Sequence, residues 1–439
     1  MIDYYKNFYQ KISFVEKCFF TLICFLPISM IIGNLLINLT FFLILILFII
    51  DLVLNKKRKF LRENYFWLLI FFFFTLLINL YFSLEPTTTL PRVLKVLMII
   101  PFVIFMRESI TKYQSEFENI IYGFWSIIFS VLVVDIVFEM IFGFNTIGLK
   151  SYIPGRIASF FGDELVAGSF FLAFSFIVIV RLSSFFRKYK NIKLAILIIS
   201  LFIISFLIGE RSNFIKFFII SFFLFFFIIK LDFKHKTYGI LLLIATLFLF
   251  FNFNENIKYR YYSQNIKNFK AETKNLEKID SKNSIIYAVN QIDRFIKNST
   301  YGAHYNAAYK IFLAHPYFGI GIKNYRNESP KEKYKNEEYT WTDKRNTTHP
   351  HQIHFEVLSE TGLFGYMTFF IFILTSLFLS IRNYLIYKNF YQLVALLYVI
   401  TTLIPFLPSG SFFSTYASSL FWVNYAIMIS YNKKLNLKF

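Results

Sequence analysis

Long apolar stretches separated by short polar loops make up most of this chain. Their lengths are close to the roughly 17–25 residues that a helix needs to cross the hydrocarbon core of a bilayer. The pattern predicts about twelve transmembrane helices, at residues 15–34, 35–54, 65–82, 89–106, 119–143, 164–181, 193–209, 213–230, 238–253, 354–381, 391–407 and 412–431. We therefore expect an all-α, polytopic membrane protein.

One long polar segment, residues 254–353, interrupts this pattern. It divides the chain into residues 1–253 with helices one to nine, the loop itself, and residues 354–439 with helices ten to twelve and a tail. The loop is the one region large enough to form a substructure outside the bilayer.

Within the loop, apolar spacing predicts short amphipathic helices at 283–296 and 301–314, and residues 316–323 indicate a turn. Residues 324–346 have little apolar periodicity, so we expect that segment to be mobile.

Composition and charge support a membrane protein. The chain is 56% hydrophobic, 22% aromatic and 16% charged, which excludes an ordinary soluble globular protein. With the N-terminus in the cytoplasm, the cytoplasmic side receives the basic loops 56–59, 181–193, 230–236 and 382–388 and the tail. The positive-inside rule thus accounts for the net charge of +20 without nucleic acid, and the long loop lies outside.

The first apolar stretch has no small-residue cleavage site and is expected to be a retained helix. Cys18 and Cys24 lie six residues apart in it. That spacing puts them on different helix faces, which argues against a disulfide and favours packing roles.

A histidine-rich junction ends the long loop, with the sequence His349-Pro350-His351-Gln352-Ile353-His354. Gly362-Leu-Phe-Gly365 follows inside the tenth predicted helix. An imidazole at the mouth of a membrane helix can take a proton from a bound hydroxyl at neutral pH, which makes His351 the candidate base.

Outer-face arginines are the second candidate chemistry. Arg156 precedes the sixth helix, and Arg211 lies in the very short connection between helices seven and eight. Two guanidinium groups facing one cavity could bind a pyrophosphate bidentately. Alternatively, Arg156 pairs with Asp163 or Glu164, and Arg211 pairs with the adjacent glutamate or with lipid headgroups. Arg92, with Lys95 beside it, is a further candidate for the phosphate site.

Four carboxylates occur near these residues in helical i, i+4 pairs. Glu356 and Glu360 either orient His351 or point to water. Asp135 and Glu139 lie inside the apolar fifth helix, where they could counter the arginine charges, line an acceptor groove, or pack in protonated form.

A zinc site on His349, His351 and His354 is the alternative for the histidine cluster. No cysteine is near, Pro350 disturbs helical geometry between the first two, and a third or fourth ligand is not evident. We therefore expect no metal and no cofactor.

Taken together, these motifs resemble the O-antigen ligase family and the related surface-polysaccharide polymerases. The resemblance rests on Arg156, on Gly209-x-Arg211-Ser212, on the turn from Ala314 to Tyr325, and on His351 followed by Gly362-x-x-Gly365. It covers residues from about 150 to 370. Gln352 departs from the pattern, because the family usually has Asn, Ser or Arg after the histidine.

The resemblance implies metal-independent glycosyl transfer at the periplasmic face of the bacterial inner membrane. The donor would be a glycan on undecaprenyl pyrophosphate, and the acceptor a sugar hydroxyl of lipid A-core. Arg156 and Arg211 would hold the pyrophosphate, His351 would accept the acceptor's proton, and the anomeric centre would invert. Trp341 and loop tyrosines could stack on sugar rings or anchor the protein in the headgroups.

Other functions remain open from the sequence. A polymerase would use the same donor with a lipid-linked glycan as acceptor, and a protein hydroxyl is a third acceptor. The spacing from the histidine to the two glycines favours the ligase. A transporter would place its site near the midplane and often shows repeated halves, whereas here the distinctive charges gather at the outer face.

Overall fold

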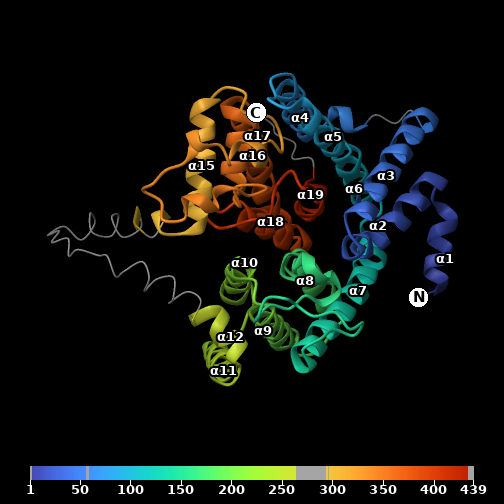
Figure 1. Ribbon diagram of the computed structural model, residues 1–439. Coiled ribbons are helices and arrows are strands. Elements are labelled where there is room, and N and C mark those ends of the chain that lie inside the picture. Colours follow the sequence, from blue (N-terminus) through green and yellow to red (C-terminus); the bar gives the residue numbers. More distant parts are fainter. Residues whose placement is uncertain (1, 56–58, 264–292, 295, 434–439) are drawn as a thin grey trace.

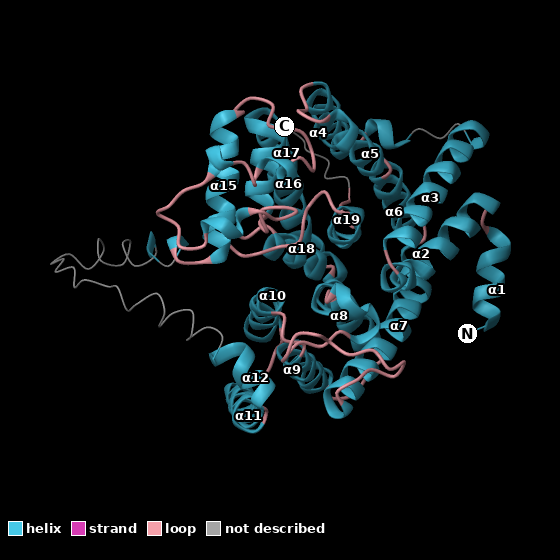
Figure 2. Cartoon of the chain, viewed as in Figure 1, coloured by secondary structure: helices cyan, strands magenta, loops and turns pink. Residues whose placement is uncertain are grey.

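The computed structural model describes residues 2–55, 59–263, 293–294 and 296–433 (Figures 1 and 2). Within these residues every regular element is a helix. The helix predicted at 283–296 falls almost entirely outside the described residues. Cys18 and Cys24 are free thiols, as predicted.

Each of the twelve predicted spans coincides with a helical stretch. Among the described residues, nine stretches are long and apolar enough to cross a membrane: Phe14–Ile32 (α2), Asn34–Leu54 (within α3, Asn34–Asn55), Asn64–Tyr81 (α4), Pro86–Lys112 (α5, Pro86–Leu97, with α6, Ile99–Lys112), Gln114–Phe142 (α7), Lys190–Leu207 (α9), Arg211–Ile228 (α10, Arg211–Phe223, with π-helix η3, Leu224–Ile228), Phe233–Phe253 (α11) and Ile353–Tyr387 (α17). Three shorter helices correspond to the remaining predictions: α8 (Ala167–Ser183), α18 (Phe390–Thr402) and α19 (Thr415–Ser430). The all-α polytopic fold is thereby confirmed.

Helix α19 is the central helix of the bundle (Figure 1). It packs against α18, α6, α3 and α8, and every residue from Ser418 to Ser430 is buried. A helix enclosed on all sides must satisfy its polar groups internally. Accordingly, Asn424 Nδ2 donates to the carbonyls of Leu420 and Ala173, the latter on α8.

Part of the long loop folds onto the start of α17. Helix α15 (Thr300–Ala314) confirms the prediction at 301–314 and packs against α17. Its N-cap is Ser299, whose hydroxyl accepts from Gly302 N at 2.9 Å.

The expectation of a mobile segment at 324–346 is wrong. This segment contains α16 (Tyr325–Glu328), η5 (Glu332–Tyr334) and η6 (Thr342–Arg345). Arg345 is buried and donates to Pro330 O at 2.9 Å and to Glu332 at 3.0 Å. Polar pairs and single buried tyrosines hold this segment in place. Such contacts produce no periodic pattern of apolar residues, so the sequence did not indicate them.

A backbone break inside α17 receives the turn at 316–323. Gly362 has φ 66° and ψ −172°, outside the helical range. The freed amides find partners in the turn, because Leu363 N donates to Pro316 O at 2.7 Å and Phe364 N donates to Tyr317 O at 3.1 Å. A Cβ on Gly362 would lie 2.4 Å from Tyr317 O, so only glycine fits.

Asn79 of α4 fastens this junction. Its Nδ2 donates to Phe318 O at 2.7 Å and to Glu360 O at 2.8 Å, and its Oδ1 accepts from Ile322 N at 3.2 Å. One buried amide thus joins α4, the turn and α17.

The close backbone approach at Gly362 predicts a stability effect. Gly362→Ala should lower the free energy of unfolding by about 1–3 kcal/mol, because alanine disfavours positive φ and its Cβ would clash with the turn. The midpoint of thermal unfolding of the purified protein in detergent measures the change. Gly123→Ala in α7 is the control, since the nearest atom to its Cβ is 3.8 Å away. Equal midpoints for the two variants would contradict this account of the break.

Candidate functional site

The loop that carries Arg156 is held by the two buried carboxylates of α7. Asp135 accepts from Thr146 N at 2.9 Å and from Ser159 Oγ at 2.6 Å. Glu139 accepts from Ala158 N at 3.0 Å and from Ser159 N at 2.5 Å. Their oxygens are therefore occupied by the loop, and these residues position Arg156 rather than neutralise it.

Arg156 pairs with an acid from a different loop than expected. Its Nη2 lies 3.2 Å from Glu210 Oε1 and donates to Leu165 O at 2.5 Å. The alternative prediction, a pairing of Arg156 with Asp163 or Glu164, is therefore wrong, because Arg156 pairs with Glu210 instead. The Nε of Arg156 is buried and has no hydrogen-bond partner among the residues that the structure describes.

Glu210 itself is held on several sides, which fixes the ion pair. It accepts from Gly168 N at 3.0 Å, at the start of α8, and from Asn213 Nδ2 at 2.5 Å. A Cβ on Gly168 would lie 2.8 Å from this carboxylate, so the packing is close. Arg211 follows immediately, as the first residue of α10.

A third arginine, Arg260, joins this region from π-helix η4 (Tyr259–Ser263). Its Nε donates to Gly209 O at 3.0 Å. Burial, followed by the positive charges of Arg211 and Arg156, lowers the pKa of Arg260 to about 10. The three guanidinium groups are therefore close enough to repel one another, which favours a ligand with more than one negative charge.

Sequence reasoning missed Arg260 and chose Arg92 instead. Arg92 lies on α5, which packs against α4 and α6. In contrast, Arg211 begins α10, Arg260 lies in η4 and donates to Gly209 O, and Arg156 pairs with Glu210. Arg260 was inconspicuous among the many basic and tyrosine residues of its loop. Its position directly after the ninth predicted helix was the available signal, because that end faces the same side as Arg156 and Arg211.

His351 belongs to a cluster of three imidazoles. It has φ 58° just before α17, and its ring centroid lies 4.1 Å from that of His349 and 5.2 Å from that of His304. Burial, followed by the charge of a neighbouring imidazole, lowers the pKa of both His351 and His304 to about 4. Burial and then Lys323 lower the pKa of His349 to about 3. All three rings are therefore neutral at pH 7, and His351 can accept a proton.

His354 is directed away from this cluster. Its Nδ1 lies 3.1 Å from Tyr366 Oη and its Nε2 lies 2.8 Å from Leu403 O, so both ring nitrogens have partners. The zinc trio considered for this junction is therefore not formed. No group of three or more His, Cys, Asp or Glu side chains arranged to hold a metal ion occurs in the described part of the chain.

The carboxylates expected to orient His351 or face water do neither. Glu356 is fully buried, accepts from Phe412 N at 2.7 Å, and lies 3.7 Å from Lys323 Nζ. A hydrogen bond from Ser411 Oγ also reaches it. Glu360 is equally buried and accepts from Tyr325 N at 3.4 Å. These acids connect the turn and the last loop to α17.

The histidine and arginine clusters meet at one end of the bundle. In the loop between α18 and α19, Ser409 N donates to His351 O at 2.8 Å, while Ser212, next to Arg211, donates to the carbonyl of Pro408. Helix α10 packs against α18 (Figure 1).

Tyr301 provides a second link between the clusters. Its ring lies 5.9 Å from that of His351, and its hydroxyl is near enough to raise the pKa of Arg260. Residues far apart in the sequence thus form one polar region.

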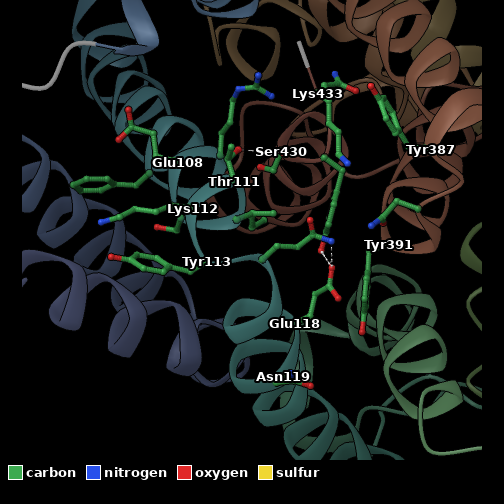
Figure 3. Close-up of a pocket in the computed structure, with 18 of the residues that line it drawn as sticks. Glu108, Thr111, Lys112, Tyr113, Glu118, Asn119, Tyr387, Tyr391, Ser430 and Lys433 are labelled. Atoms are coloured by element: carbon green, nitrogen blue, oxygen red, sulfur yellow. Dashed lines mark hydrogen bonds between the residues drawn. The ribbon is translucent and has the colours of Figure 1, made fainter. Parts of the chain in front are cut away.

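A large cavity of ≈ 1560 Å³ lies among the opposite ends of the helices (Figure 3). None of the predicted site residues lines it. Several of its polar groups pair with one another, since Lys112 Nζ lies 2.6 Å from Glu16 and Tyr431 Oη donates to Glu118 at 3.0 Å. The candidate chemistry therefore lies at the other end.

Comparison with known families gives one match. Residues 194–370 match the sequence model of the family described as O-antigen ligase. This range contains Arg211, Arg260 and His351, whereas Arg156 precedes it. A search of curated proteins found no match. This part of the chain is therefore similar to O-antigen ligases, and together with the membrane helices the match supports glycosyl transfer of the ligase or polymerase type.

Proposed function

We propose that this protein is an O-antigen ligase that transfers a glycan from undecaprenyl pyrophosphate to a sugar hydroxyl of lipid A-core. The reaction takes place at the periplasmic face of the bacterial inner membrane. The observation that carries the proposal is the meeting of three guanidinium groups with a cluster of neutral imidazoles around Tyr301. The guanidinium groups can bind a pyrophosphate, and the neutral imidazoles can accept a proton from a hydroxyl.

The arginines stabilise the leaving group. As the bond between the anomeric carbon and the pyrophosphate oxygen breaks, its electron pair stays with the pyrophosphate. Arg156, Arg211 and Arg260 face the growing negative charge, and bidentate contacts with phosphate oxygens suit the guanidinium fork. Preorganised cations lower the barrier because they need no rearrangement at the moment of reaction.

His351 activates the acceptor. Its neutral ring takes the proton from the acceptor hydroxyl while the hydroxyl oxygen forms a bond to the anomeric carbon. Attack from the side opposite the pyrophosphate inverts the configuration at that carbon. Burial keeps the imidazole base neutral, while the guanidinium groups of the anion site remain cationic.

A surface-polysaccharide polymerase is the second candidate, because it uses the same donor and the same two clusters with a lipid-linked glycan as acceptor. Transport is less well supported. The clusters lie at helix ends, where α10 begins at Arg211 and α17 begins after His351, whereas transporter sites lie near the midplane.

A deletion strain tests the proposed function. Cells complemented with wild type should carry long glycan chains on lipid A-core, and cells with His351→Ala or no plasmid should lack them and accumulate long polymer on the lipid carrier. Lipopolysaccharide gels and lipid extracts from the same cultures measure both. A core bearing a single repeat would make the protein a polymerase, and normal chains in the His351→Ala strain would remove His351 as the base.

Replacing Arg156 by lysine tests the bidentate contact. Arg156→Lys should lower donor affinity by about tenfold or more, because lysine keeps the charge but cannot form two parallel hydrogen bonds to a phosphate. Binding of undecaprenyl pyrophosphate to the purified protein measures the effect. Arg382→Lys, at the exposed far end of α17, is the matched control. An unchanged affinity of Arg156→Lys for undecaprenyl pyrophosphate would show that this residue acts only as the structural partner of Glu210.

The low pKa of His351 predicts the pH profile. The base must be unprotonated, so kcat/KM should be constant from about pH 5.5 to 8 and fall tenfold per pH unit below about pH 4. Initial transfer rates measure the profile, and recovery of activity after return to pH 7 shows that the protein stayed folded. A profile that bends near the ordinary histidine pKa of about 6.5 would show that His351 is not buried during catalysis.

A further inference from the structure

We propose that His304 and His351 together form a subsite for the reacting hydroxyl of the acceptor, in which His304 binds the oxygen that His351 deprotonates. This inference rests on the proposed glycosyl transfer and adds a catalytic residue to it. His304 lies on α15, in the long loop, and was not selected from the sequence.

The position of His304 is fixed by its helix. The side chain is only 6% exposed. Its backbone carbonyl accepts from Tyr325 Oη at 3.1 Å, which ties this turn of α15 to α16. Because the backbone is held and the ring is enclosed, the imidazole is aimed at His351 before any substrate arrives.

One ring nitrogen of His304 lacks a partner. Its Nδ1 is buried and makes no hydrogen bond to any residue that the structure describes. Burying an unsatisfied polar group costs free energy, so such a group in a native fold calls for a reason. His354 is the contrast, because both of its nitrogens are hydrogen-bonded. A histidine kept only for packing would resemble His354.

The geometry toward His351 suits a shared hydroxyl. The two ring centroids lie 5.2 Å apart with an interplanar angle of 44°, and Tyr301 flanks both rings at 5.9 and 6.3 Å. A neutral imidazole carries one donor and one acceptor nitrogen. A hydroxyl placed against both rings can accept from the N–H of His304 and donate its own proton to His351.

The surroundings keep His304 neutral. The titratable or charged groups that face it are His351 and His349 from the junction, Tyr301 from its own helix, and Tyr325 from α16. Burial and His351 lower the pKa of His304 to about 4. At neutral pH the ring can therefore donate a hydrogen bond without placing a positive charge beside the base.

The step balances with these groups. The acceptor O–H bond breaks, its proton moves to the free nitrogen of His351, and the oxygen forms a bond to the anomeric carbon. The bond to the pyrophosphate breaks, and its electron pair leaves with the pyrophosphate toward the arginines. The His304 N–H keeps its hydrogen bond to the oxygen throughout, so it orients the nucleophile and undergoes no net change.

Purified full-length protein tests this subsite, with donor and acceptor glycolipids extracted from the deletion strain as substrates. His304→Met removes the hydrogen bond, and His304→Gln keeps an N–H donor on a side chain of similar reach. We expect Met to lower kcat/KM for the acceptor by about tenfold and Gln by about threefold or less. Inhibition by undecaprenyl pyrophosphate should be unchanged in both, because the arginines are intact. His315→Gln, at the end of the same helix, is the control.

The outcomes separate the two proposals. Absence of transfer by wild type, or full activity in His351→Ala, would overturn the proposed function itself. Active wild type and inactive His351→Ala, combined with a His304→Met variant within twofold of wild type, would overturn only the subsite. Equal losses in Met and Gln with a changed undecaprenyl pyrophosphate inhibition would assign His304 a structural role. If His304→Met does not fold, Gln is compared with the shorter Asn, and equal acceptor kinetics for these two would also overturn it.

Discussion

Buried carboxylates with occupied oxygens are the constraint on which this structure depends. In a low-dielectric interior each such group must find hydrogen-bond donors or an opposite charge. Glu139 accepts hydrogen bonds from two backbone amides close to Arg156, and Glu210 forms an ion pair with Arg156 itself. Glu356 forms an ion pair with Lys323 and accepts a hydrogen bond from the amide of Phe412. In each case a helix end fastens a loop, and the fastened loops carry the groups of the candidate site.

This arrangement separates charge within the site. The three arginines lie near one another and Glu210 pairs with Arg156, so the region stays positive and attracts an anion. The imidazoles are enclosed among aromatic rings and remain neutral. Acid–base chemistry needs a neutral base, and anion stabilisation needs positive charge. The long loop supplies the neutral imidazoles, and the helix junctions supply most of the arginines.

Physical reasoning on the sequence succeeded where the signal was local. The apolar stretches and the amphipathic helix at 301–314 both follow from neighbouring residues. Reasoning failed where partners come from distant segments. Asp135 and Glu139 bind a loop that follows α7, and Glu356 meets a loop more than fifty residues later. The roles of these acids depend on pairing that no helical spacing encodes.

The sequence by itself determined the class of protein, the positions of the membrane helices, and His351, Arg156 and Arg211 as candidates, because hydrophobicity and motif spacing are properties of the chain. Only the tertiary structure decided which groups stand beside them. Arg260 and His304 lie in a polar loop whose residues look alike in sequence, and folding selects these two by bringing η4 to Gly209 and α15 to α17. Burial and proximity, which set charge state and partners, exist only after the chain has packed.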